Sequence, residues 1–174
     1  MMKVGTGAVD GEQSPRAELG RLGANATHTV SPMSREREWV EALALPAQRI
    51  EAMRALIGAV NARELRAVVV SEASLQALID GLRHPNPQVR WWCVQLLDHC
   101  SDSRAIDAIV PMLDDPVPRV RRNAAHALSC AACKPAWCGD LPPAAVRTLE
   151  TMARSDPNLK VRAEATRALL VSAH

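Results

Sequence analysis

The sequence has neither Phe nor Tyr, and the aromatic side chains among its 174 residues are four Trp. Sheets are usually rich in aromatic and β-branched residues, whereas Ala, Leu and Arg are good helix formers. Because Ala, Leu, Arg and Val are left to build the core, the composition favours helices with small residues at their contacts. The hydrophobic fraction of 48% is that of an ordinary globular protein.

The sequence also lacks any apolar run of about 18 residues, and its beginning lacks the apolar core of a secretory signal. These absences predict a cytoplasmic protein with no membrane partner. The net charge of +2 gives no reason to expect nucleic acid or an anionic membrane as the partner. The five Cys are an odd number, so we expect reduced thiols or metal ligands rather than a disulfide framework.

The N-terminal segment, residues 1–33, carries five of the eight Gly and shows no sustained periodicity. We expect it to be disordered, either as a functional tail or as a misassigned or vector-derived leader, since Met33 could be the natural start. Residues 34–174 repeat apolar positions at spacings of three and four. They predict one helical domain of about four hairpins with short connections.

Three segments of the chain superpose without gaps, at offsets of 31 and then 41 residues. Each places a Pro near the start of an expected helix, where a missing amide proton costs no hydrogen bond, and two place an Asp before it as an N-cap. The segments are HPNPQVR (His84–Arg90), DPVPRVR (Asp115–Arg121) and DPNLKVR (Asp156–Arg162). The apolar residues that follow at every turn are Val89, Cys93 and Leu97, then Val120, Ala124 and Leu128, then Val161, Ala165 and Leu169. Self-similarity at this period predicts a solenoid.

These segments resemble the HEAT-like repeats, in particular the short bacterial form seen in proteins of the phycobilisome lyase type, with its D-P-x-x-x-V-R and A-x-x-A-L pattern. The resemblance covers residues 70–172 and implies an all-α fold, an α-solenoid of stacked antiparallel helical hairpins. It says little about function, because the class includes adaptors, lyases and nucleic-acid binders. A degenerate first repeat is expected before them, with Pro46 and Ile50 in the places of Pro85 and Val89.

Second helices of such hairpins usually line the concave surface, so their side away from the core is the expected binding surface. At about 100° per residue, Arg119 and Arg122 fall on the opposite side of the helix from the core residue Val120. Trp91 lies opposite Val89, where an exposed indole is costly unless it anchors a partner. The predicted partner-binding residues are Trp91, Trp92, Gln95, His99, Arg119, Arg122, Lys160 and Arg167.

A second hypothesis concerns metal. Spacings of four and seven place His126, Cys130 and Cys133 on one helix face, and an insertion at residues 131–140 could bring Cys138 back as a fourth ligand. Zn²⁺ suits such a set of N and S ligands in a closed structural site. The spacing matches no recognised zinc signature, and free Cys is commonly a small buried apolar residue, so incidental thiols are the alternative.

Other recurring residues are interpreted as structural. Cys93 stands where the two later repeats have Ala, so we expect it to fill a small core position. The Arg of each V-R pair is expected to support the neighbouring repeat, through helix ends or a carboxylate such as Asp114. These arginines are Arg90, Arg121 and Arg162.

Three functions are open at this point. The first is a non-enzymatic adaptor that binds an acidic or amphipathic segment of a partner protein, with Trp91 as the anchor. The second is the zinc-binding module, and the third is a nucleic-acid binder, by analogy with the HEAT-like alkylpurine DNA glycosylases. No triad, phosphate loop or paired carboxylates occur, so we assign no catalytic residue. A bilin lyase role is implied by the resemblance alone.

Overall fold

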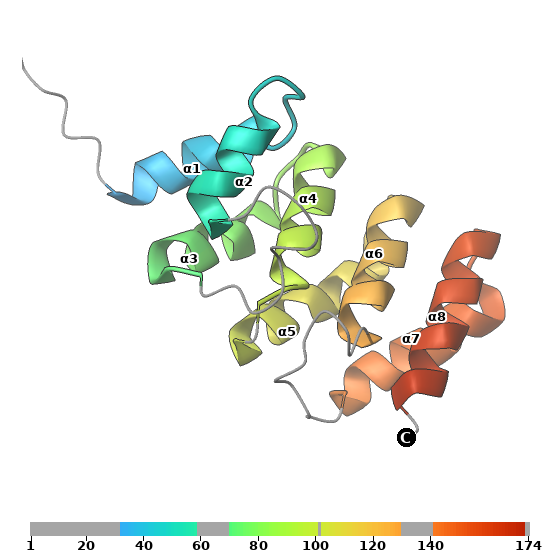
Figure 1. Ribbon diagram of the computed structural model, residues 1–174. Coiled ribbons are helices and arrows are strands. Elements are labelled where there is room, and N and C mark those ends of the chain that lie inside the picture. The colour runs from blue at the N-terminus through green and yellow to red at the C-terminus, as the bar shows by residue number, and fades with distance from the viewer. Residues whose placement is uncertain (1–31, 59–69, 101, 130–140, 173–174) are drawn as a thin grey trace, which may run out of the picture.

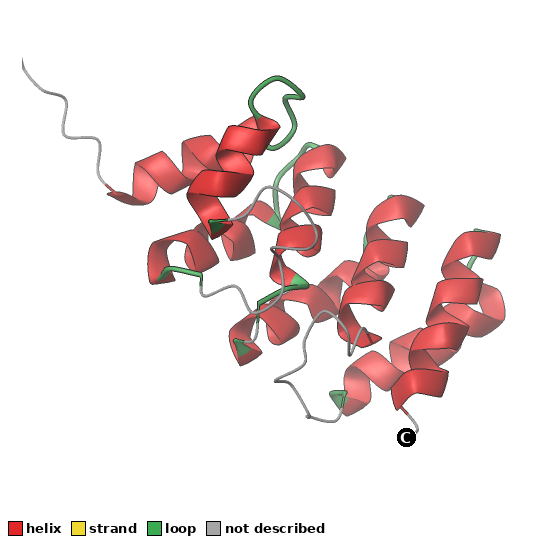
Figure 2. Cartoon of the chain, in the orientation of Figure 1, coloured by secondary structure: helices red, strands yellow, loops and turns green. Residues whose placement is uncertain are grey.

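The computed structural model describes residues 32–58, 70–100, 102–129 and 141–172. The regular elements in these ranges are all helical (Figure 2). They are α1 (Pro32–Ala42), α2 (Arg49–Ile57), α3 (Glu72–Gly81), α4 (Pro87–Leu97), α5 (Ser103–Ile109), the 3₁₀ helix η1 (Val110–Asp114), α6 (Pro118–Ser129), α7 (Pro143–Ser155) and α8 (Leu159–Ser172). Most of the predicted leader, residues 1–31, lies outside the described residues.

The described helices pair into four hairpins that stack along the molecule (Figure 1). Helix α1 packs on α2, α3 on α4, η1 on α6, and α7 on α8. The second helices α4, α6 and α8 form a row, in which α6 contacts both of its neighbours. The predicted all-α solenoid of stacked hairpins is confirmed.

The first helix of the third hairpin changes geometry at Pro111. Helix α5 ends at Ile109, and the chain continues as η1. Pro has no N–H for the carbonyl four residues back, and its ring clashes with that carbonyl, so an α-helical ladder cannot pass through it. The tighter 3₁₀ turns continue the helix and keep Leu113 fully buried.

The residue that opens each repeated segment fixes the start of the following second helix. Asp115 accepts the N–H two residues further on at 2.8 Å, and Asp156 does the same at 2.8 Å. His84 stands in their place in the second hairpin, and its Nδ1 accepts the N–H of Asn86 at 3.0 Å. The proton of this ring is therefore on Nε2, which donates to Glu41 at 2.8 Å. A neutral His thus replaces the Asp of the repeat.

The predicted core positions are buried. The six residues at the first two repeated positions, all 0% exposed, are Val89, Cys93, Val120, Ala124, Val161 and Ala165. Burial raises the pKa of the Cys93 thiol to about 12, so the thiol is protonated and inert, as its predicted core role requires. At the third position Leu97 and Leu128 are 0% and 1% exposed, whereas Leu169 is half-buried at the end of the described stack.

Arginines join successive hairpins. Arg90 donates from Nε and Nη2 to the two oxygens of Asp115 at 2.7 and 3.0 Å. Arg121 donates in the same way to Asp156 at 2.8 and 3.0 Å. The predicted supporting role is confirmed for Arg90 and Arg121, whereas Arg162 donates to the Asp156 carbonyl of its own hairpin at 2.7 Å. Asp114 is not the acceptor. The acceptor is the Asp that begins the next repeated segment, because that carboxylate is already held at the turn by a backbone N–H.

The first hairpin contains the same arginine contact at a position that the sequence prediction missed. Arg49 Nε donates to the carbonyl of Leu43, six residues earlier, at 2.9 Å. Arg90 Nη1 donates to the carbonyl six residues before it at 2.9 Å. Arg49 therefore stands in the position of Arg90, and Ile50, which was aligned with the buried Val89, is 60% exposed. The predicted alignment of the first repeat is wrong by two residues.

Candidate functional site

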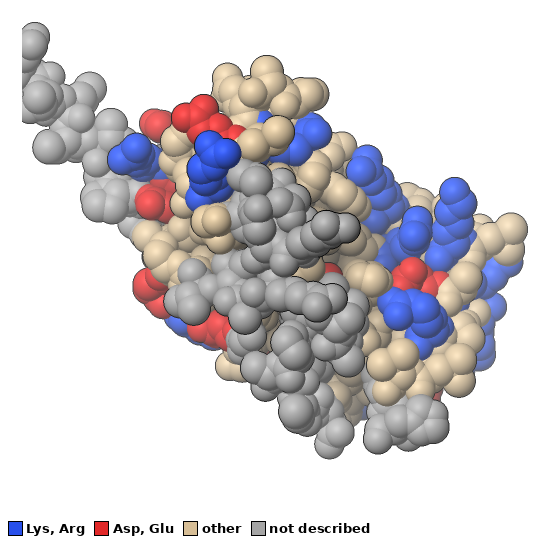
Figure 3. Space-filling view, in the orientation of Figure 1, with Lys and Arg blue, Asp and Glu red and all other residues tan. Residues whose placement is uncertain are grey.

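A cavity of about 570 Å³ opens between the second helices α4, α6 and α8. Figure 3 shows Lys and Arg side chains gathered over α6 and α8 around an acidic patch. The residues that line the cavity are Trp91, Gln95, Pro118, Arg119, Arg122, Asn123, His126, Asn158, Lys160 and Glu164. The structure thus brings together five of the eight predicted partner-binding residues and His126 of the predicted metal set.

Repeat geometry explains why these side chains meet. Residues at the same repeat position lie at the same height and on the same side of neighbouring parallel helices. Trp91 and Arg122 share one such position, and Arg119 and Lys160 share another. The cavity is therefore built from equivalent positions on successive helices, and its chemistry is set by residues that the repeat pattern does not fix.

Trp91 forms one wall of the cavity. Its indole is half-buried and meets the Trp92 ring edge to face, with ring centroids 4.6 Å apart at an interplanar angle of 80°. The guanidinium carbon of Arg119 lies 4.2 Å from the centroid of the Trp91 ring. Asn123 donates to the Trp91 carbonyl at 3.2 Å. The ring is thus fixed from both sides, and it holds a cation beside the cavity.

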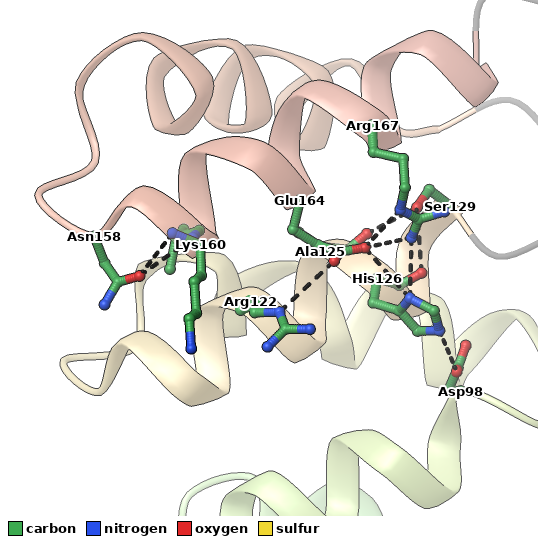
Figure 4. A network of polar contacts seen from close by, with 10 residues as sticks. Asp98, Arg122, Ala125, His126, Ser129, Asn158, Lys160, Glu164 and Arg167 are labelled. Atoms are coloured by element: carbon green, nitrogen blue, oxygen red, sulfur yellow. Dashed lines mark hydrogen bonds and ion pairs between the residues drawn. The ribbon is translucent and has the colours of Figure 1, made fainter.

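Three cations face the cavity: Arg119, Arg122 and Lys160. Asn158 Oδ1 accepts the N–H of Lys160 at 3.0 Å, which turns the amide nitrogen of Asn158 away from the helix (Figure 4). This nitrogen adds a neutral donor to the wall. Glu164 is the one carboxylate among the lining residues. Donors and positive charge dominate, so the cavity suits an anionic group.

Glu164 lies in a network of polar contacts (Figure 4). Arg167 donates to Glu164 Oε1 from Nε at 2.9 Å and also from Nη2. Arg122 Nε lies 3.7 Å from Oε2, and His126 Nδ1 lies 3.3 Å from Oε1. Burial opposes ionisation of Glu164, but the hydrogen bond and charge of Arg167, together with His126, outweigh it and lower its pKa. The negative charge of Glu164 is therefore already compensated.

His126 connects this network to α4. Arg167 Nη2 lies 2.9 Å from His126 Nδ1. Nε2 lies 3.7 Å from Asp98 Oδ2, at the end of α4. The imidazole thus contacts residues from all three second helices. Arg167 contacts Glu164 and His126 but is not itself among the lining residues, and its predicted contact with a partner stays a prediction.

His99 and Trp92 do not line the cavity. His99 is 8% exposed, because α4 ends at Leu97 and the chain then tightens, so that the His99 N–H bonds to the Leu96 carbonyl three residues back at 3.3 Å. The expected placement of His99 on the binding surface is therefore wrong. Trp92 packs at the flank, with the Arg49 guanidinium 4.9 Å from its ring centroid.

Four cavity residues were missed by the sequence prediction: Pro118, Asn123, Asn158 and Glu164. The repeat offsets contained the signal for two of them. Asn123 and Glu164 share the repeat position of Trp92, which had been assigned to the surface. Asn158 lies before its helix, where a rotation angle measured from the core says nothing about side-chain direction.

The zinc hypothesis is untested by the structure. Cys130, Cys133 and Cys138 lie outside the described residues, and His126 is engaged as above. Within the ranges that the structure does describe, no three His, Cys, Asp or Glu side chains are arranged to hold a metal ion. Among the described helices, none is long and apolar enough to cross a membrane.

The fold and the cavity define a helical-repeat protein with a polar surface along its second helices. The chain belongs to the HEAT repeats family, whose model matches residues 75–170. No curated protein matches the sequence.

Two examples represent the solved structures that are similar to this chain. One is human deoxyhypusine hydroxylase in complex with glycerol, which is 26% identical over 82% of this chain and 43% of that chain, with a TM-score of 0.55. The other is an engineered protein, 22% identical over 80% of this chain and 62% of its own, with a TM-score of 0.48. The present chain spans less than half of the hydroxylase.

Proposed function

We propose that this chain is a non-enzymatic HEAT-repeat adaptor that binds an acidic or amphipathic segment of a partner protein in the cavity between α4, α6 and α8. The observation that carries this proposal is the charge of the cavity wall. Arg119, Arg122 and Lys160 face the cavity, whereas the carboxylate among them, Glu164, is hydrogen-bonded to Arg167. An entering anion therefore meets donors without displacing a carboxylate, and this complementarity favours acidic partners.

Trp91 supports an apolar contact beside the acidic one. Trp and Arg are the residue types that most often dominate binding energy at interfaces, and the half-buried Trp91 lies beside Arg119 in the cavity wall. The indole is held by Trp92 and Arg119, so little freedom is lost on binding. The favoured ligand is a segment with carboxylates next to a large apolar residue.

The other functions have weaker support. Nucleic-acid affinity depends on many phosphate contacts, whereas this cavity offers three cations and the whole chain has a net charge of +2. The likeness to the hydroxylase covers 43% of that enzyme, so it supports shared repeats rather than a shared activity.

A binding assay with defined probes tests the proposal. A fluorescein-labelled peptide of Glu alternating with Leu is titrated with the full chain at low salt, and fluorescence polarisation is followed. The cavity variant Arg119→Glu/Lys160→Glu should bind at least about tenfold more weakly. The matched control, Arg147→Glu/Arg154→Glu, makes the same charge change at exposed residues of α7 and should keep most of the affinity.

Three results would overturn the proposal. The first is absence of binding by any acidic peptide. The second is an equal loss in the cavity variant and the control, which would reduce the effect to net charge. The third is tighter binding of a single-stranded oligonucleotide with the same dependence on Arg119 and Lys160, which would replace the protein partner by nucleic acid. For a natural partner, affinity capture is carried out with the wild type, the cavity variant and the α7 control. A protein that the wild type and the control retain, and the cavity variant does not, binds at the cavity.

A further inference from the structure

Helix α8 lies at the end of the described stack (Figure 1), and the residues on its outer face form a second pattern. Four exposed, uncharged residues of this helix lie on one side at spacings of four, three and four: Leu159, Ala163, Thr166 and Leu170. Leu159 and Leu170 are 70% and 65% exposed, more than any other large hydrophobic residue in the described ranges. This spacing is that of a helix-packing seam, and we call these four residues the α8 seam.

Two of these four repeat positions pack the second helices together inside the molecule. At the offset of 41 residues, Thr166 and Leu170 correspond to Ala125 and Ser129 of α6. Ala125 and Ser129 are 0% and 6% exposed, and α8 packs on α6. The C-terminal half of the α8 seam, Thr166 and Leu170, therefore continues an interface that the repeat already uses, at the end of the described stack.

The seam is symmetrical about its midpoint, which falls between Glu164 and Ala165. If a second α8 runs antiparallel, each Leu159 meets a Leu170 and each Ala163 meets a Thr166. The small pair in the middle lets the helices approach closely, and the large pairs interlock at both ends. We propose that the α8 seam pairs two copies of this chain through antiparallel α8 helices around a two-fold axis.

Head-to-tail stacking of a second copy fits less well. Inside the chain, Arg90 and Arg121 each bind an Asp of the next hairpin. Arg162 is the next arginine of this series, but the first hairpin has Leu43 at the repeat position of those acidic residues. A first hairpin from another copy would thus offer Arg162 no carboxylate at that position. The two-fold arrangement needs none and closes after two copies.

Charge also shapes this association. Lys160 and Arg167 flank the seam on its cavity side, and in an antiparallel pair they approach the same two residues of the other copy. Like charges then oppose the dimer, so added salt should strengthen it. A seam of four residues per helix is short, so we expect a weak dimer with a Kd on the order of 10–100 µM.

Sedimentation equilibrium of the full chain tests the proposal, with circular dichroism as the check that each variant folds. Leu159→Glu alone and Leu170→Lys alone should each weaken the dimer at least about tenfold. The double variant Leu159→Glu/Leu170→Lys should return to within about threefold of the wild type, because antiparallel pairing sets each Glu against a Lys of the other copy. Within one helix the two positions are about 16 Å apart, so a contact inside the chain cannot produce this rescue.

The matched control is Leu45→Glu, which charges a residue that is 49% exposed outside the seam and should leave the dimer unchanged. A wild-type chain that stays monomeric at the highest concentration would overturn the proposal. A double variant as weak as the single ones, or association that continues beyond two copies, would overturn it as well.

Discussion

Arg121 of α6 donates two hydrogen bonds, at 2.8 and 3.0 Å, to the carboxylate of Asp156 in the next hairpin. The two side chains are 12% and 5% exposed, so the pair is largely removed from water. Asp156 also accepts the N–H of Asn158 at 2.8 Å and so fixes the turn before α8. One carboxylate therefore joins two hairpins and places the start of a helix that lines the cavity.

Removal of this carboxylate should destabilise the stack. Asp156→Ala leaves Arg121 without its acceptor in a site with little water, and we expect the free energy of unfolding to fall by about 2–4 kcal/mol. Urea unfolding followed by circular dichroism measures it. The matched control, Glu72→Ala, removes one carboxylate from the exposed pair of Glu72 with Arg104 and should barely move the midpoint. Equal effects of the two substitutions would contradict a structural role for the Arg121 pair.

Acid should weaken the same contact. Burial opposes ionisation of Asp156, but the hydrogen bonds from Arg121 and the Asn158 N–H, with the nearby positive charge, lower its pKa in the folded state. In the unfolded chain the Asp156 carboxyl has the ordinary pKa of Asp, near 3.9. Around that pH the unfolded state therefore binds more protons than the folded state. The stabilisation is complete above that pH and is lost as the pH falls through the folded value. Urea midpoints between about pH 6 and 2 should drop for the wild type, and less steeply for Asp156→Asn.

Gly81 is required by packing. A Cβ there would lie 2.5 Å from Cys93 Sγ and 2.8 Å from Val40 Cγ1, both in the buried core. Gly81→Ala should therefore lower the free energy of unfolding by about 1–3 kcal/mol. Cys93→Ala, the residue that later repeats carry, removes the shorter contact, so the double variant should be about 1 kcal/mol more stable than the sum of the single effects. Thermal unfolding of the wild type, the two single variants and the double variant measures this coupling energy. Strictly additive effects of the two substitutions would contradict the predicted contact.

Much of the fold could be predicted because the same sequence pattern occurs three times in the chain. Val89, Val120 and Val161 occupy the same position in successive second helices, and all three are buried. An apolar residue that recurs at equivalent positions identifies both the hairpin and the side of the helix that faces the core. The first repeat lacked this support. It has Leu43 at the position where the third and fourth hairpins have Asp115 and Asp156, so the sequence carried no acidic marker to align it.

The site was predictable only where helix rotation applies. Arg122 and Lys160 lie on regular turns and line the cavity as their angles require. His99 lies two residues beyond the end of α4, outside the regular turns from which its rotation angle was counted. The pairing of Glu164 with Arg167 depends on side-chain conformations across a helix surface, which repeat periodicity does not encode. The charge of the cavity was therefore predictable, but the compensation of its carboxylate was not.

Salt should separate the two halves of the proposed recognition. Arg119 contributes mainly charge, so Arg119→Ala should weaken binding of the acidic peptide about tenfold at low salt and much less at about 0.5 M salt, where charges are screened. Trp91 contributes apolar contact, so Trp91→Ala should weaken binding by a similar factor at both salt concentrations. Arg119 packs on the Trp91 ring at 4.2 Å, hence the double variant should lose less than the product of the two single effects. Fluorescence polarisation at the two salt concentrations measures all three. If Trp91→Ala lost its effect at high salt, the indole would act by holding the Arg119 guanidinium and would not itself contact the ligand.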